Sequence, residues 1–372
     1  MLWLTVSGLA LTAFGQTTIK IARVPADPLE LVTGQAQAAV TPASRDAALK
    51  LLARAHTSYQ LRKAKRPWDL KVHFTVDSRG ETSYDGAWDM EDRFVPGHGL
   101  HWTAKSTAGY TITGIFAPKA VYSESTGSEA TASDSTTAAI PLRLQEARSL
   151  LYNPLPSVQY AGSGSIRTFV ASYHGSPVTC LLLARSRKVQ NPSVGRGWEE
   201  SEECIDPQSG LLQIHSEAPG RYAVYDYSNP ARIGDRMAPR KVTVTEGGRT
   251  VMKLQVKSLE GRASLDATLF VPTEQMKASQ MPAMTSVKKI TRIVMSSQVA
   301  STSATKLRPV CIFGMVNSAG KLVEAHSLQP SDPNSKAAVK DAKAIDFAAM
   351  MTPGAPPQQH FVFVIEKFVS AE

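Results

Sequence analysis

Residues 241–258 read KVTVTEGGRTVMKLQVKS, and this stretch indicates which kind of sheet the chain forms. Apolar and polar residues alternate on both sides of residues 246–248, which is the period of a strand with one buried face. Two glycines between the alternating runs are typical of a tight hairpin turn. In the second run Met252, Leu254 and Val256 share one face and lysine or glutamine residues the other. The stretch predicts an antiparallel hairpin with an apolar inner face and a polar outer face.

The same period recurs upstream, where Val72, Phe74 and Val76 alternate with polar residues. Helical spacing is found instead at residues 44–64, with Ser44 as the expected N-cap, and again at residues 140–151. The pattern predicts a curved antiparallel sheet with a polar outer and an apolar inner face; that this sheet is a half-barrel packed on a helix is what the family resemblance given below implies. Further strands are expected at 82–90, 99–105, 110–116, 165–173, 177–185, 211–216 and 222–227.

The C-terminal residues predict a small β-β-α-β unit, with strands at 307–317 and 321–328, a helix at 335–350 and a strand at 360–369. The fold class is therefore expected to be α+β. The expected organisation is a signal peptide at 1–15, an N-terminal extension at 16–43, a half-barrel domain at 44–272 with a disordered insert near 123–139, a linker at 273–289 and a C-terminal domain at 290–372.

The apolar run from Leu2 to Phe14 is too short to span a bilayer and ends at Gly15. It predicts a secretory signal cleaved after Gly15, although no Lys or Arg precedes it. Since no cysteine lies near the cleavage point, a lipid anchor is not expected. The predicted location is the periplasm.

The chain of 372 residues has a formal charge of +9 and a pI near 9.4, which favours anionic partners such as lipid headgroups or cell-wall polymer. Its basic residues are scattered, and the densest group, residues 62–66, is typical of a solvated helix end. We expect no nucleic-acid partner, because the recognised modules are missing. Peripheral association with the envelope fits the charge.

Two of the three cysteines, Cys180 and Cys204, lie in or at the start of apolar runs, and an exported protein meets oxidising conditions. We expect them to form a disulfide between adjacent strands. Cys311 lies in the apolar run Val310–Phe313 and is expected to be a buried thiol.

No convergent catalytic set is recognisable in the sequence. His98 and His101, near Glu91 and Asp92, are the best candidates for metal ligands, but an exposed strand end explains them better because no third ligand has suitable spacing. Residues 162–165 lack the order of a serine-hydrolase elbow, and phosphate-binding loops are missing. We therefore predict no enzyme, no cofactor and no metal site.

Aromatic and aliphatic residues of the predicted strands suit the lining of a hydrophobic cavity. The same residues suit ordinary core packing equally well, and the sequence leaves both interpretations open. The cavity candidates are Phe74, Trp88, Trp102, Tyr110, Tyr222, Val224 and Leu254.

Several segments between residues 45 and 275 resemble lipoprotein-carrier domains of the LolA/LolB type. The segment from Tyr84 to Trp88, continuing through Pro96 to Trp102, resembles their early strands, and the run from Cys204 to Leu212 resembles their later Asp-x-x-Ser/Thr-Gly-Leu-Leu hairpin. The resemblance implies a half-open β-barrel wrapped over a helix, with an apolar concavity for the acyl chains of a lipid or lipoprotein.

The tail is similar to TonB C-terminal domains, on residues 310–323, 342–350 and 361–368. This resemblance implies a domain that binds an envelope partner by pairing an extended peptide along a sheet edge. Phe361, Phe363 and Ile365 are the candidate edge residues. The chain lacks the retained anchor and the long Pro-rich spacer of an energy-transducing TonB, so we expect peptide or wall binding without energy coupling.

Two hypotheses follow. The first is a non-catalytic periplasmic binding protein that holds a hydrophobic ligand in the half-barrel and docks an envelope partner through its tail. The second is a structural interaction protein, in which the tail binds a peptide or the cell wall and the first domain is only a scaffold.

Overall fold

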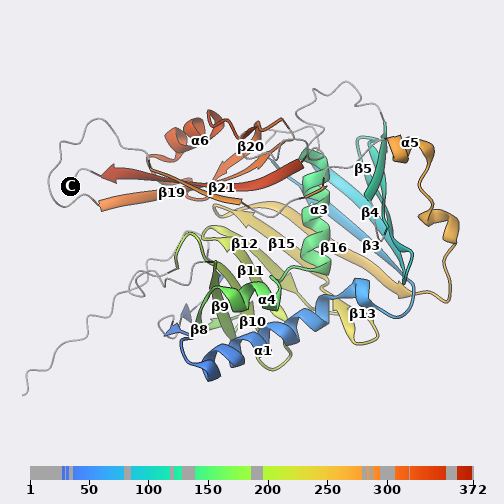
Figure 1. The fold of residues 1–372 in the computed structure, drawn as a ribbon, viewed down its shortest axis with the longest axis horizontal. Coiled ribbons are helices and arrows are strands. Elements are labelled where there is room, and N and C mark those ends of the chain that lie inside the picture. The colour runs from blue at the N-terminus through green and yellow to red at the C-terminus, as the bar shows by residue number, and fades with distance from the viewer. Residues whose placement is uncertain are drawn as a thin grey trace, which may run out of the picture.

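The computed structural model is dominated by antiparallel β-sheet and has few helices (Figure 1). The fold is mostly β, built on a large antiparallel sheet that is consistent with the predicted curved sheet. The structure describes residues 27–29, 31–32, 37–78, 85–117, 121–127, 139–185, 196–278, 283–284, 288–293, 306–317, 319–348 and 358–370. The predicted signal peptide lies outside these residues.

In the described residues the main sheet has 14 strands, and its order is β1-β8-β9-β10-β11-β12-β15-β16-β3-β4-β5-β6-β7, with β2 also paired to β8. These strands are β1 (Leu31–Val32), β2 (Gln37–Ala38), β3 (Trp68–Val76), β4 (Gly86–Val95), β5 (Gly99–Ser106), β6 (Thr111–Phe116), β7 (Val121–Thr126), β8 (Ser165–Tyr173), β9 (Ser176–Ala184), β10 (Ser201–Ile205), β11 (Leu212–Ala218), β12 (Arg221–Asp226), β15 (Lys241–Glu246) and β16 (Arg249–Gly261).

The predicted hairpin at residues 241–258 lies at the centre of this sheet and is formed by β15 and β16. Val242 is paired with Leu254 and Val244 with Met252, so the apolar residues share one face. Gly247 and Gly248 have φ of +57° and +84°, values that residues with a side chain rarely adopt. The hairpin prediction is confirmed.

Strand β16 also pairs with β3, along nine partner positions from Met252–Val76 to Gly261–Trp68. This long-range pairing joins the N-terminal strands to the later ones in one sheet. The terminal strands β1 and β7 are not paired with each other in the described chain. The sheet is curved and open, as expected of a half-barrel (Figure 1).

Two boundaries near the helices differ from the prediction. Helix α1 (Pro42–Tyr59) is capped by Thr41, whose side chain accepts a hydrogen bond from the Ser44 amide, so Ser44 is not the N-cap. The prediction missed Thr41 because Pro42 at the first helical position moves the start of the helix. Strand β7 takes in residues 121–126, so the predicted insert starts too early; its residues 128–138 lie outside the described chain.

Helix α3 (Ala139–Tyr152) confirms the helix predicted at residues 140–151. It lies in front of the central strands of the main sheet (Figure 1). Its residues Leu144, Ala147, Leu150 and Leu151 are at most 5% exposed. Two shorter helices, α4 (Val158–Ser163) and α5 (Glu274–Ala278), the 3-10 turns Leu61–Lys63 and Ala267–Phe270, and the hairpin β13 (Ala231–Ile233) and β14 (Arg236–Ala238) complete this part of the chain.

The C-terminal residues form a second sheet with the order β17-β21-β19-β20, in which β18 also pairs with β21. The predicted helix ends at Lys343 instead of Met350, and α5 and β17 show that part of the predicted linker is structured. The elements are β17 (Ala283–Met284), β18 (Lys288–Ile293), β19 (Lys306–Val316), β20 (Leu322–Ser327), α6 (Ser335–Lys343) and β21 (Gln358–Ser370).

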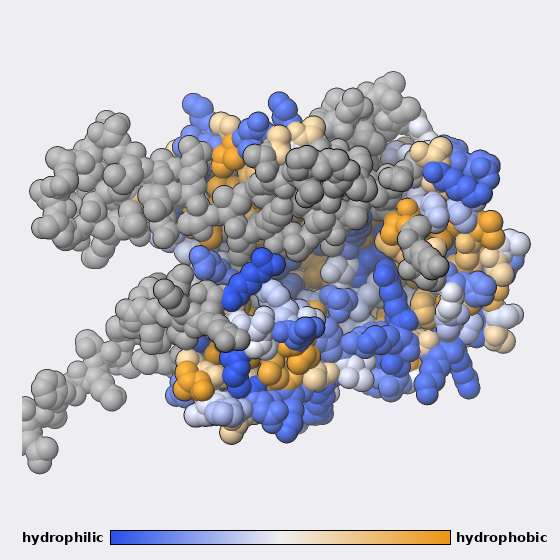
Figure 2. All heavy atoms as spheres, in the orientation of Figure 1, coloured by the Kyte–Doolittle hydropathy of each residue, from blue (hydrophilic) through white to orange (hydrophobic). Residues whose placement is uncertain are grey.

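The two sheets share a core. One face of the C-terminal sheet, with Phe313, Phe361 and Phe363, belongs to the same buried cluster as the inner face of the main sheet. Its other face, with Ile312 and Val364, packs against α6. On the face shown in Figure 2, hydrophilic residues predominate among those coloured and hydrophobic ones form small separate patches. In the described residues no helix is long and apolar enough to cross a bilayer.

Candidate functional site

Five of the seven predicted cavity residues meet on the inner face of the main sheet. Phe74, Trp88, Trp102, Tyr110 and Leu254 belong to one buried cluster and are at most 7% exposed. The rings of Phe74 and Trp88 are stacked 6.1 Å apart, and Tyr110 meets Trp88 edge to face at 6.1 Å. These residues form a continuous apolar layer.

The other two candidates, Tyr222 and Val224, lie on the opposite face of β12. They pack in a separate cluster around the disulfide, whereas Ala223 and Tyr225 of the same strand belong to the inner core. Since side chains of a strand alternate between faces, these two candidates cannot line the same cavity as the other five.

The inner face is covered by α3 and the C-terminal sheet. The guanidinium of Arg148 on α3 lies 3.8 Å from the centre of the Trp102 ring, and a Cβ at Gly114 would come within 2.4 Å of the same ring. Phe313 and Phe363 of the C-terminal sheet are fully buried in this cluster. In the described part of the chain, side chains of α3 and the C-terminal sheet lie over the concavity.

The predicted partner-binding edge is not an edge in the structure. Phe361, Phe363 and Ile365 lie on β21, which pairs with β18 on one side and with β19 on the other. Their side chains are at most 5% exposed because they face the main sheet. On the side away from β21, the outermost strand in the described chain is β20, which pairs with β19 alone.

A buried cluster of charged residues, which we call the seam cluster, lies where α3, the main sheet and the C-terminal sheet meet. Arg143 of α3 is central to it. Its Nη1 lies 2.8 Å from Glu146 Oε2 and 3.6 Å from Glu246 Oε1, and its Nη2 contacts Glu324 Oε1. The members are Arg143, Glu146, Glu217, Arg221, Glu246, Glu324 and His326.

Arg221 of β12 is the second cation of the seam cluster. Its Nε lies 3.0 Å from Glu246 Oε1, and its other nitrogens contact Glu146 and Glu217. Burial acts to lower the pKa of Arg221, but these carboxylates raise it well above its usual value. Its guanidinium also lies 4.2 Å from the centre of the Phe313 ring. These charged and aromatic contacts join α3 and the C-terminal sheet, which together cover the inner face, to the main sheet.

The seam cluster escaped the sequence analysis. The helical spacing of the apolar residues of α3 predicts the helix but says nothing of Arg143 and Glu146, since polar positions between apolar ones usually face solvent. The helix itself carries no signal for them: Leu144, Ala147 and Leu151 form an apolar stripe without charged residues, so the burial of Arg143 and Glu146 depends on the elements that pack on the other sides of the helix.

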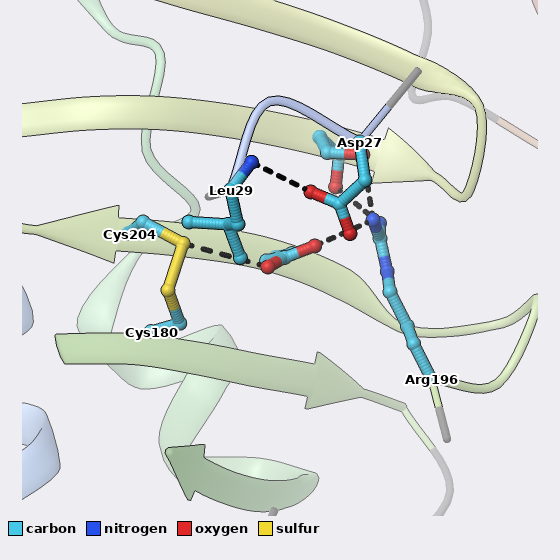
Figure 3. Close-up of a disulfide and its surroundings, with 7 residues drawn as sticks. Asp27, Leu29, Cys180, Arg196 and Cys204 are labelled. Atoms are coloured by element: carbon cyan, nitrogen blue, oxygen red, sulfur yellow. Dashed lines mark hydrogen bonds and ion pairs between the residues drawn. A yellow bond between two sulfur atoms is a disulfide. The ribbon is translucent and has the colours of Figure 1, made fainter. Parts of the chain in front are cut away.

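The predicted disulfide is confirmed. Cys180 of β9 and Cys204 of β10 are directly paired across the two strands and bonded to each other. Leu29 packs in the same cluster, and Figure 3 shows Asp27 and Arg196 pointing toward one another beside it. Cys311 is a buried free thiol, as expected.

Glu202 lies next to this disulfide. Its carboxylate is 2.8 Å from Arg196 Nη1, and its Oε1 is 3.4 Å from Cys204 Sγ. Burial raises the pKa of Glu202 to about 7, against the lowering effect of Arg196. Because a disulfide sulfur carries no proton, the contact with Cys204 is a hydrogen bond only when Glu202 is protonated and donates it.

Glu202→Gln is expected to flatten the pH dependence of stability between pH 4.5 and 7. The folded protein holds this proton up to a higher pH than the unfolded chain, so the free energy of unfolding of the wild type falls as pH rises through this window, by at most about 3 kcal/mol from this group. Urea unfolding at a series of pH values measures the effect, with Glu199→Gln as an exposed control. An unchanged slope in Glu202→Gln would refute the assignment.

The two histidines considered as metal ligands do not converge on a site. The rings of His98 and His101 both lie against Phe270, at 6.1 and 6.4 Å. Asp92 points inward and bonds Arg148 and Tyr152, while Glu91 pairs with Lys71 and Arg93 on the outer face. These contacts explain all four residues structurally.

A cavity of about 550 Å³ is formed by described residues near the ends of β11, β12 and β15. Val224 is the one predicted cavity residue that lines it. Its other lining residues include charged and polar ones, so it differs from the apolar concavity that a lipid carrier requires; among them are Tyr173, His174, Asp206, Asp226 and Lys241.

No protein-family model and no curated protein matches the chain. Among solved structures, it is similar to a domain from Vibrio parahaemolyticus named as an outer membrane lipoprotein-sorting protein, with 8% identity, a TM-score of 0.36 and coverage of 61% of this chain and 97% of that one. For a DUF1329 family protein from Desulfovibrio piger, the identity is 10% and the TM-score 0.34, with coverage of 61% of this chain and 96% of that one. For the MucA/MucB complex of Pseudomonas aeruginosa, the identity is 10% and the TM-score 0.28, with coverage of 72% of this chain and 75% of that one. Identities and TM-scores this low assign neither a family nor a function.

Proposed function

We propose that the protein is a non-catalytic binding protein of the periplasm that shelters the acyl chain of a lipid or lipoprotein against the inner face of its half-barrel. One observation carries this proposal: the main sheet is open, and its continuous apolar inner face is covered by separate elements, not by closure of its own strands. The confirmed disulfide and the signal-like run at residues 2–14 support an exported location.

Ligand entry would require α3 or the C-terminal sheet, which cover the inner face, to move away from it. The side chains of Phe74, Trp88 and Trp102 are at most 2% exposed in the closed form. An acyl chain that replaced α3 or the C-terminal sheet would restore the apolar contacts of these rings, at roughly 0.8 kcal/mol for each buried methylene. The seam cluster would then set how readily the cover opens.

The C-terminal sheet is the proposed docking surface for an envelope partner. An added strand would have to pair beside β20 or β18, because β21 is already paired on both sides. Helix α6, which packs on β20 and β19, presents Lys336 and Lys340 to solvent one turn apart. These lysines suit an anionic peptide or wall polymer.

Because protein side chains cover the inner face of the main sheet, a second candidate is an interaction protein in which the main sheet is a scaffold. Removing the C-terminal sheet would not separate the two functions, because its inward face is part of the shared core. Charge reversal of Lys336 and Lys340 keeps that core intact. Loss of an envelope partner from Lys336→Glu/Lys340→Glu, with no lipid found in the wild type, would favour the scaffold.

Mass spectrometry of organic extracts from the purified full chain tests the carrier proposal. We expect a lipid or fatty acid at a stoichiometry approaching one per chain, released only on denaturation because the inner face is closed to solvent. A parallel extract of Trp102→Arg, which places a charge in the apolar layer, is expected to hold much less. Extracts without lipid from both proteins would contradict the proposal.

A further inference from the structure

Three side chains of the seam cluster have the composition of a transition-metal site. Glu246 comes from the end of β15 in the main sheet, and Glu324 and His326 come from β20 in the C-terminal sheet. Each offers one ligand atom, and these atoms all lie within 4.8 Å of one another. All three side chains are at most 1% exposed. Two carboxylates and one imidazole are ligands that zinc accepts.

Two atoms of this group are buried without a protein partner. Among the described residues, Glu246 Oε2 and His326 Nδ1 have no hydrogen-bond partner. Leaving such a group unsatisfied costs about 1–3 kcal/mol, and more when it is charged. The two atoms belong to different sheets but to residues of the same three-ligand group.

The charges around the three side chains are compatible with a bound cation. Among the described residues, the buried carboxylates of Glu146, Glu246 and Glu324 lie beside the guanidiniums of Arg143 and Arg221. A divalent cation between Glu246 and Glu324 would add positive charge where these buried carboxylates gather.

The arginines leave one oxygen of Glu246 for this ion. Arg221 Nε and Arg143 Nη1 approach Oε1 of Glu246, at 3.0 and 3.6 Å, and Oε2 has no partner among the described residues. Oε1 of Glu324 already contacts Arg143 Nη2 and His326 Nε2, so the ion would replace one of these contacts or use the other oxygen of Glu324. Ligands at about 2.0–2.1 Å from a tetrahedral zinc ion are roughly 3.3 Å apart, so ligand atoms that lie within 4.8 Å of one another would move together by up to about 1.5 Å on binding.

We propose that Glu246, Glu324 and His326 form a binding site for a divalent transition-metal ion, Zn²⁺ in the first place, that bridges the main sheet and the C-terminal sheet. The ion would act as a clamp on the cover of the half-barrel. The site does not depend on the identity of the ligand of the inner face.

Metal content and thermal stability of the full chain test this site. The protein is stripped with EDTA, loaded with ZnCl₂, desalted and analysed for zinc. We expect one zinc ion per chain and a rise in Tm that EDTA reverses. His326→Gln is expected to lower zinc retention at least tenfold. His215→Gln is the matched control, because His215 is also buried beside a carboxylate, Glu203 at 2.8 Å, but belongs to no such three-ligand group among the residues that the structure describes.

Cobalt substitution keeps the test decisive if His326→Gln folds poorly. Co²⁺ bound by the wild type is expected to give the strong visible absorption of a four-coordinate site, and one equivalent of zinc should abolish it. The proposal is overturned if the wild type retains no zinc and shows no cobalt spectrum. Equal zinc retention in His326→Gln and wild type would overturn it as well.

Discussion

Arg143→Met is expected to lower the free energy of unfolding by about 3–5 kcal/mol, the usual cost of breaking a buried ion pair. The substitution keeps most of the side-chain volume but leaves Glu146, Glu246 and Glu324 without the guanidinium that lies among them. Arg143 is 1% exposed, so water cannot take over its role without opening the seam. Equilibrium unfolding in urea measures the change.

Arg249→Met is the matched control for this experiment. Arg249 pairs with Asp77 on the surface, where the two side chains are 38% and 53% exposed, and exposed pairs contribute about 1 kcal/mol or less. We expect the control to unfold within 1 kcal/mol of the wild type. If Arg143→Met behaved like Arg249→Met, the seam would be hydrated and the cover would not be held as described.

Replacing both cysteines of the disulfide, in Cys180→Ala/Cys204→Ala, is expected to cost about 3 to 4 kcal/mol in the chain-entropy model. The bond closes a loop with a sequence separation of 24 residues. It joins β9 to β10 within the buried cluster that also contains Leu29 and Tyr222. Urea unfolding of the oxidised wild type against the double variant measures this difference.

Reductant supplies the control for the disulfide. A reducing agent should move the wild type toward the double variant and leave the variant unchanged. Cys311 is a buried free thiol of the C-terminal sheet, so reductant should not change the stability of the protein through this residue. A reductant effect of the same size on the double variant would show that the bond is not the source of the stability.

Much of the main sheet could be predicted from sequence because its signals are local. The period of two in Val72–Val76 and Met252–Val256 identifies strands and their buried faces, and Gly247 and Gly248 identify the turn. The cysteine pair could be predicted because both residues lie in strands that follow one another along the chain. Errors of boundary, as at Thr41 and Lys343, arose where caps rather than periodicity end the helix.

The site could be predicted only in part, since it depends on long-range packing. Alternation along β21 gives Phe361, Phe363 and Ile365 a common face, but it does not reveal that β18 pairs on the far side of the strand. Phe74 and Trp102 look the same in sequence whether a ligand or α3 covers them. For that reason the sequence alone does not predict that α3 and the C-terminal sheet cover the inner face.

Quenching of tryptophan fluorescence by a brominated fatty acid tests the central claim most directly, because bromine quenches only rings that it contacts. Trp68, Trp88 and Trp102 are buried in the inner core, whereas Trp198 packs against this core and is only partly buried. We predict saturable quenching at one acyl chain per protein that falls sharply in Trp88→Phe/Trp102→Phe. Absence of saturable quenching, or quenching unchanged in the double variant, would contradict an acyl-chain site on the inner face.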